Sequence, residues 1–148
     1  MGDYQTVVVG TDGSDSSLRA VDRAGRLASG SDAKVIVATA YLAAPEDTQA
    51  ADVLKGEGYK MAGNARIYEI LREASERATA AGAANVEERA IEGAPVDALV
   101  DLANEVGADL LVVGNVGLNT IAGRLLGSVP ANVARKSKSD VLIVHTTG

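Results

Sequence analysis

Short apolar runs alternate along the chain with longer segments in which apolar residues recur every three or four positions. The runs are rich in Val and Ile without polar alternation, which is typical of strands buried on both faces of a parallel sheet. The run at 86–92 differs because four of its side chains are charged, and it predicts an edge strand. The five predicted strands span residues 6–11, 34–41, 86–92, 109–114 and 140–146.

Amphipathic segments predict a helix between each pair of consecutive strands. Ser14 is placed to cap the first helix, and Gly82 and Gly107 are placed to end the second and third. The stretch 43–63 is polar and rich in turn residues, and it predicts a long loop of the kind that often serves as a lid. The predicted helices span residues 14–28, 67–82, 95–107 and 128–136.

This alternation of strands and helices predicts an α/β fold with an open, five-stranded parallel sheet and helices on both faces. The length of 148 residues fits a single domain, residues 1–148. Ligands in such sheets bind beyond the carboxyl ends of the strands, where the strand order reverses. We therefore expect a site in the loops after the first and fourth strands.

An excess of acidic side chains limits the partners of this chain. Twenty Asp and Glu against fourteen Lys and Arg give a net charge of −6, which argues against nucleic-acid binding. The lack of cysteine excludes disulfides and cysteine metal sites, and His145, the single histidine, excludes a site with two imidazole ligands. Hard cations such as Mg²⁺ remain compatible. No apolar stretch could span a bilayer, so we expect a cytoplasmic protein without membrane contacts.

Two glycine-containing loops carry the candidate chemistry, one at Gly10–Ser14 and one at Gly114–Gly117 that is followed by Gly127 and Ser128. Neither contains the lysine of a Walker A loop, and Val112 breaks the dinucleotide-binding fingerprint. Glycines let the backbone approach a ligand closely, and a helix that starts at Ser128 would offer free N–H groups and the positive end of its dipole. Oriented backbone amides of this kind can hold a phosphate group even in an acidic protein.

These residues also have structural interpretations. Gly10 and Gly13 could shape a strand-to-helix turn, and Asp12 could satisfy nearby N–H groups in an Asx turn. Ser128 could cap a helix, although a cap and a phosphate ligand use the same atoms.

The spacing G-x2-G-x9-G-[ST] from Gly114 to Ser128, combined with the Thr-Asp-Gly-Ser turn at 11–14, resembles the nucleotide-binding branch of the universal stress protein family. The resemblance covers nearly the whole chain. It implies a Rossmann-like, adenine nucleotide alpha hydrolase-like fold with strand order 3-2-1-4-5. It also implies a homodimer in which the fifth strand pairs with its copy through Val141, Leu142, Ile143 and Val144.

The same resemblance implies contacts to an adenine nucleotide. Asp12 would accept hydrogen bonds from ribose hydroxyls or help to hold a metal ion on the phosphates, and Gly10 and Thr11 would line the same edge. Ala40 would meet the adenine through backbone groups. The residues implied to hold ribose and phosphate are Val113, Gly114, Gly117, Gly127, Ser128 and Val129, with Asn115 of the same loop in the binding set.

One departure from the family pattern bears on the ligand. Many members carry a basic residue directly after the second glycine, where this chain has Leu118. The loss of that charge should weaken a triphosphate more than a cyclic monophosphate, although Arg124 could restore it. Some members of the family bind cyclic AMP, so both cyclic AMP and ATP, the latter with Mg²⁺, are candidate ligands, with cyclic AMP slightly favoured.

We expect a non-catalytic stress protein that senses or buffers an adenine nucleotide. No cysteine is present and nothing in the sequence places a serine beside His145, so no pair of nucleophile and base is evident. Two alternatives stay open. One is slow Mg²⁺-dependent ATP hydrolysis or phosphoryl transfer with Asp12 on the metal. The other is a dimeric interaction module whose nucleotide site is vestigial.

Overall fold

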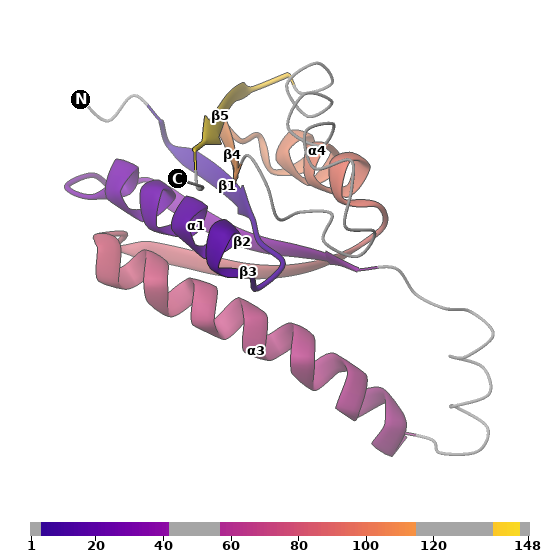
Figure 1. The fold of residues 1–148 in the computed structure, drawn as a ribbon. Coiled ribbons are helices and arrows are strands. Elements are labelled where there is room, and N and C mark those ends of the chain that lie inside the picture. The colour runs from indigo at the N-terminus through magenta and orange to yellow at the C-terminus, as the bar shows by residue number, and fades with distance from the viewer. Residues whose placement is uncertain (1–3, 42–56, 115–137, 146–148) are drawn as a thin grey trace.

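A parallel sheet of five strands forms the centre of the molecule (Figure 1). The computed structural model describes residues 4–41, 57–114 and 138–145, with the backbone alone at 57–65 and Pro95. The strand order is β3-β2-β1-β4-β5 and all neighbours are parallel, so the predicted sheet and its order are confirmed. The strands are β1 Thr6–Gly10, β2 Lys34–Tyr41, β3 Asn85–Glu92, β4 Leu110–Gly114 and β5 Asp140–Val144.

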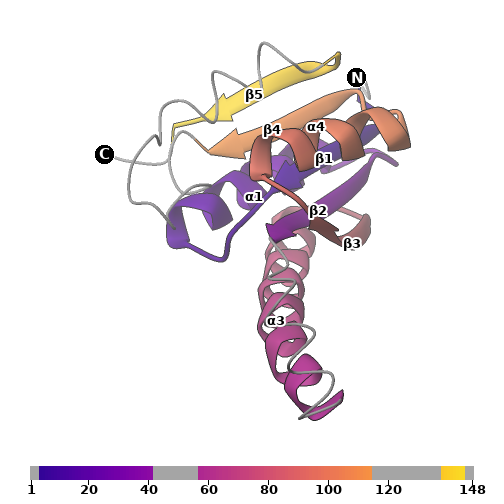
Figure 2. The same ribbon diagram turned by 90° about the vertical axis from the view of Figure 1, so that its right-hand side faces the viewer.

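Helices cover both faces of the sheet (Figure 2). Alternate residues of β1 point to opposite faces, so Val7 and Val9 join one apolar cluster and Val8 joins the other. Helices α1 and α3 pack on the first cluster, and α4 packs on the second. Burial on both faces explains why β1 shows no polar alternation. The helices are α1 Asp15–Ala28, α3 Glu57–Ala81 and α4 Pro95–Val106.

The ends of α1 and α4 follow from local chemistry and lie where the sequence predicts them. Ser14 adopts an extended conformation (φ −74°, ψ 158°), and its side chain accepts a hydrogen bond from the Ser17 backbone N–H at 3.2 Å. Gly107 follows α4 with a φ of +68°, in the left-handed region that glycine adopts without a steric penalty. The predicted helical segments 14–28 and 95–107 are therefore confirmed.

Helix α3 begins at Glu57, ahead of the predicted start at Ile67, so the prediction of a loop over 57–63 was wrong. Apolar periodicity reports burial, and the part of α3 from Ile67 onward packs on the core through Leu71, Ala74 and Ala78. The first turns of α3 run beyond the sheet (Figure 2), and once a helix is nucleated each further residue adds a hydrogen bond. Residues 43–56 of that predicted loop and the predicted helix 128–136 lie outside the described residues.

Strand β3 forms one edge of the sheet, as its charges predicted. The Glu87 carboxylate accepts hydrogen bonds from Arg89 Nε at 2.8 Å and from Lys34 Nζ at 3.1 Å. These two bonds, the one from Arg89 first, hold the pKa of Glu87 below its usual range. Glu88 lies on the opposite face beside α3. The charges of this edge are thus distributed over both faces of the strand.

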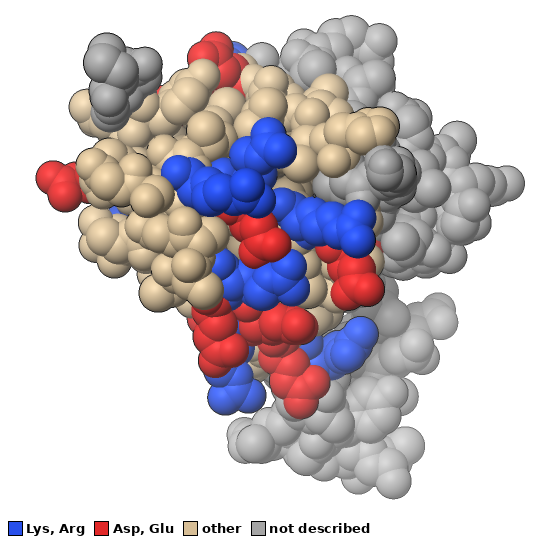
Figure 3. All heavy atoms as spheres, turned by 60° about the vertical axis from the view of Figure 1, so that its left-hand side comes forward, with Lys and Arg blue, Asp and Glu red and all other residues tan. Residues whose placement is uncertain are grey.

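Helices α1 and α3 approach so closely that glycine is required between them. A Cβ atom on Gly25 would lie 2.6 Å from the Ala78 carbonyl oxygen and 2.8 Å from the Ala81 Cβ atom. Beside this contact, Arg77 donates from Nε and Nη2 to the Asp22 carboxylate at 3.0 and 2.6 Å, which raises the pKa of Arg77. Figure 3 shows basic and acidic side chains interspersed over one face of the molecule.

Replacement of Gly25 by alanine should lower the free energy of unfolding by about 1–3 kcal/mol, because the added methyl group forces the helices apart. Helix propensity alone would change stability in the other direction, by about 1 kcal/mol in favour of alanine. Urea unfolding measures the difference. The control is Arg23→Ala on the exposed face of α1, expected within about 0.5 kcal/mol of the wild type. A Gly25→Ala variant as stable as the wild type would contradict the close approach.

Candidate functional site

The order of the strands reverses between β1 and β4. From β1 the chain passes through α1 to β2 and through α3 to β3, and α4 then carries it back to β4 on the other side of β1. Since α1 and α3 lie on one face and α4 on the other, the connections that leave β1 and enter β4 diverge at this point. The region beyond the carboxyl ends of β1 and β4 is therefore where an open α/β sheet binds its ligand.

The predicted site residues that the structure describes lie at this one edge. Gly10 ends β1 opposite Ala38 of β2, and Ala40 lies two positions further along β2. Val113 and Gly114 end β4, and both are buried. The residues that the parallel register brings to this edge are Gly10, Thr11, Asp12, Ala40, Val113 and Gly114. The predicted site residues outside the described part of the chain are Asn115, Gly117, Gly127, Ser128 and Val129.

The turn between β1 and α1 is organised by the Asp12 side chain. Asp12 Oδ1 accepts a hydrogen bond from the Ser14 backbone N–H at 2.9 Å, which closes an Asx turn. The structural role predicted for Asp12, the acceptor in an Asx turn, is therefore confirmed. Gly13 lies between them with a φ of +87°, which favours glycine. Asp12 itself is half-buried.

Two buried hydroxyl groups lie beneath this turn. The Oγ1 atom of Thr11 and the Oγ atom of Ser17 are 2.7 Å apart, and both side chains are buried. The Thr11 backbone N–H donates to the Ala38 carbonyl at 2.9 Å, so the backbone of Thr11 continues the pairing of β1 with β2. Sequence reasoning missed Ser17. Its signal is its place three residues after the cap Ser14, the position that Glu or Gln takes in a capping box.

Two glycines near the site also have packing reasons. A Cβ atom on Gly10 would lie 2.7 Å from Leu99 Cδ1 of α4, so a side chain at this position would require the Leu99 side chain to shift. A Cβ atom on Gly13 would lie 3.0 Å from Ile70 Cγ1 of α3. Close packing thus favours glycine at both positions, whether or not a ligand approaches them.

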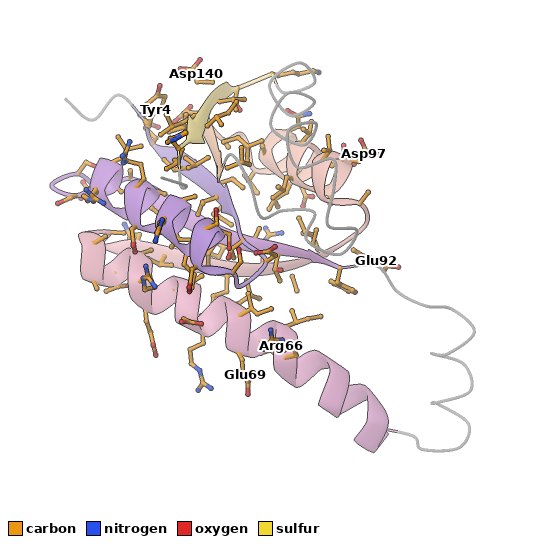
Figure 4. The ribbon with its side chains drawn as sticks, in the orientation of Figure 1. Tyr4, Arg66, Glu69, Glu92, Asp97 and Asp140 are labelled. Atoms are coloured by element: carbon orange, nitrogen blue, oxygen red, sulfur yellow. The ribbon has the colours of Figure 1, made fainter. Side chains whose placement is uncertain are left out.

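The opposite, amino edge of the sheet is closed by side chains of the protein itself. The Asp109 carboxylate accepts hydrogen bonds from the backbone N–H groups of Gln5 at 2.6 Å and Thr6 at 3.1 Å. The Tyr4 hydroxyl donates to Asp140 at 2.9 Å, and the two side chains lie together in Figure 4. These carboxylates serve the ends of β1, β4 and β5.

Two further acidic side chains lie toward the carboxyl edge of the sheet. Glu92 ends β3 and Asp97 lies in the first turn of α4, both on the side of the molecule where β2 and β3 end (Figure 4). Within residues 4–41, 57–114 and 138–145 there is no group of three or more acidic or histidine side chains that could hold a metal ion. No helix in this part of the chain is both long enough and apolar enough to cross a membrane.

Comparison with known proteins identifies the family. The family model of the universal stress protein family matches residues 3–145. Universal stress protein Rv1636 from Mycobacterium tuberculosis is 72% identical over 147 residues, which are 99% of this chain and all of that protein. A putative universal stress protein from Staphylococcus haemolyticus is 30% identical and aligns with 97% of this chain and 86% of its own.

One solved structure adds a ligand to this comparison. It is the crystal structure of a universal stress protein in complex with cAMP, with a TM-score of 0.74 and 67% sequence identity. The alignment covers 97% of this chain and 98% of that one.

The contact between Gly10 and Leu99 predicts a non-additive pair of substitutions. Gly10→Ala should destabilise the protein by about 1–3 kcal/mol through overpacking. Leu99→Ala should cost about 2–5 kcal/mol through a cavity. In the double variant the new methyl group enters the space that Leu99 leaves, so the loss should be smaller than the sum of the two. Chemical denaturation of all four proteins measures this, and strict additivity would contradict the packing of Leu99 on Gly10.

Proposed function

Because the chain belongs to the universal stress protein family, we propose that it binds an adenine nucleotide beyond the ends of β1 and β4 and prefers cyclic AMP to ATP. The observation that carries this proposal is the solved universal stress protein in complex with cAMP, which is 67% identical over nearly the whole chain. The location is supported by the reversal of strand order at β1 and β4.

The charges at the carboxyl edge support a ligand of low negative charge. Asp12, Glu92 and Asp97 all lie on this side of the molecule, and their field disfavours a triphosphate more strongly than a cyclic monophosphate with one negative charge. The uncharged Leu118, at a position that is basic in many family members, also favours a ligand of low negative charge. Val113 and Gly114 end a fully buried strand, so ribose and phosphate would meet main-chain groups there.

Asp12 is suited to the ribose. Its carboxylate already accepts the Ser14 N–H through Oδ1, which fixes the orientation of the side chain. A carboxylate can accept several hydrogen bonds, so it can also take the free ribose hydroxyl of cyclic AMP. If Mg²⁺-ATP binds instead, the same carboxylate would help to hold the metal together with phosphate oxygens.

We propose binding without catalysis, so that this cytoplasmic protein senses or buffers nucleotide in a stress response. The hydroxyl groups of Thr11 and Ser17 are buried and hydrogen-bonded to each other, which removes them as nucleophiles toward a bound phosphate. Slow Mg²⁺-dependent hydrolysis and a vestigial site in an interaction module are the competing functions.

Calorimetric titration of the full chain should show saturable binding of cyclic AMP, with weaker binding of ATP both with and without Mg²⁺. Absence of heat with either nucleotide at roughly 50 µM protein would refute the proposal and favour the vestigial site. A phosphate-release assay on the same samples separates binding from catalysis. Mg²⁺-dependent turnover of ATP would support the enzymatic alternative.

We also propose that the chain forms a homodimer through β5. This strand is the outer strand of the sheet beyond β4, and Ile143 on it is 42% exposed, so an apolar side chain is available at an edge that can pair with a second strand. Val141 and Leu142 are half-buried, so pairing with a second β5 would cover them further.

Replacement of Ile143 by lysine should convert the dimer to a monomer, because a charge on an edge strand opposes edge-to-edge pairing. Sedimentation analysis measures the mass. Tyr68→Lys is the matched control, since Tyr68 is also an exposed large side chain, 59% accessible, but lies on α3. A monomeric wild type, or an Ile143→Lys variant that stays dimeric, would place the interface elsewhere or exclude it.

A further inference from the structure

We propose that Thr11 and Ser17 are positioning residues for the nucleotide, an inference that rests on the proposed function. Their hydroxyl pair fixes the turn that carries Asp12 and determines which polar groups this turn presents to the ligand. Both side chains are inaccessible to a ligand, because Thr11 is 1% and Ser17 0% exposed.

The two hydroxyl groups bond to each other and also to backbone groups of the turn that carries Asp12. They lie in an interior of mostly Val, Leu and Ala, in which Thr39 is the other buried polar side chain among the described residues. The burial of a hydroxyl carries a desolvation cost that its hydrogen bonds offset. When both partners of a buried hydrogen bond are replaced by apolar groups of the same shape, stability is often nearly unchanged. A Val and an Ala at positions 11 and 17 would fill almost the same volume, but the backbone N–H groups of Asp12 and Gly13 would lose these two acceptors.

The hydroxyl pair accepts hydrogen bonds from backbone amides of the turn above it. The Asp12 N–H donates to Ser17 Oγ at 3.3 Å, and the Gly13 N–H donates to Thr11 Oγ1 at 3.1 Å. The Ser14 N–H in turn donates to Asp12 Oδ1 at 2.9 Å. Three consecutive amides of the turn are therefore directed at acceptors within the protein.

The protons of the pair can be arranged so that each is used once. Ser17 Oγ lies 3.0 Å from the Ser14 carbonyl oxygen and donates to it. Thr11 then donates its own proton to Ser17 Oγ across 2.7 Å. Both hydroxyl oxygens also accept one of the turn amides, and this arrangement leaves neither hydroxyl short of a partner.

These hydrogen bonds determine which polar groups the turn presents to a ligand. Because its amides at 12, 13 and 14 are already engaged, the turn presents the Asp12 carboxylate and not a nest of N–H groups. Such a surface accepts hydrogen bonds from the ribose and repels the phosphate, so the nucleotide can enter in one orientation only. Thr11 and Ser17 thus act on the ligand through Asp12.

The test uses cyclic AMP titration together with urea unfolding of the nucleotide-free chain. Thr11→Val keeps the β-branched shape and loses the hydroxyl, Thr11→Ser keeps the hydroxyl, and Ser17→Ala removes the partner. Thr11→Val and Ser17→Ala should each weaken cyclic AMP binding about tenfold, and Thr11→Ser should bind within about threefold of the wild type. Amide hydrogen exchange at Asp12 and Gly13 should accelerate in the two weakened variants only.

A matched control exists at the other end of α1. Ser31 Oγ donates to the Ala28 carbonyl at 3.0 Å and accepts the Ala33 N–H at 3.3 Å, so Ser31→Ala removes a similar pair of bonds at the amino edge. Ser31→Ala should leave cyclic AMP affinity unchanged while it changes the free energy of unfolding by about as much as Ser17→Ala does.

A double-mutant cycle with Asp12→Asn shows whether the pair acts through Asp12. Asparagine retains an oxygen for the Asx turn but loses the charge, so it should weaken binding by itself. In that background Thr11→Val should have less than about a threefold further effect. Full additivity would overturn the inference, as would wild-type affinity in Thr11→Val and Ser17→Ala, or loss of cooperative unfolding in both. If the wild type itself does not bind cyclic AMP, the proposed function fails and the inference fails with it.

Discussion

The burial of β1 between β2 and β4 is the constraint on which the rest of the structure depends. A strand covered on both faces must pair its backbone groups on both sides, and parallel pairing on each side brings three carboxyl ends to one edge. Helices α1 and α3 then cover one face and α4 the other, so the strand order reverses at β1. The position of the candidate site follows from this arrangement of the core and does not require any special loop.

Close approach of backbones is the second constraint, and it comes from the composition. A chain without Phe and Trp fills its core with Val, Leu and Ala, so helices and strands must lie near one another to exclude water. Gly25 between α1 and α3 and Gly10 beneath Leu99 show the result. At Gly10 packing alone favours glycine, because this residue ends β1 at the candidate site and leaves room for Leu99 of α4.

The acidity of the protein is compatible with its proposed anionic ligand if the phosphate lies away from the turn after β1. In the described turn after β1, the amides are engaged by Thr11, Ser17 and Asp12, so this turn presents acceptors. Phosphate would have to be held on the β4 side, where Val113 and Gly114 lead into the second glycine-containing loop. Such a division would suit a nucleotide with few negative charges.

The sequence by itself determined the strands, the edge character of β3, the caps of α1 and α4 and the edge of the sheet that carries the candidate residues. Apolar periodicity and capping chemistry are local, and they report burial and helix ends directly. The strand order came from a family resemblance and not from the residues alone. Only the tertiary structure decided where α3 begins. Its first turns extend beyond the sheet, and the apolar periodicity of the sequence predicts a helix only from Ile67. The tertiary structure also decided the roles of Ser17 and Gly10. Ser17 is a serine early in an amphipathic helix, and its burial follows from the packing of α1 on β1. Gly10 is a glycine at a strand end, and its contact with Leu99 follows from the packing of α4 on β1.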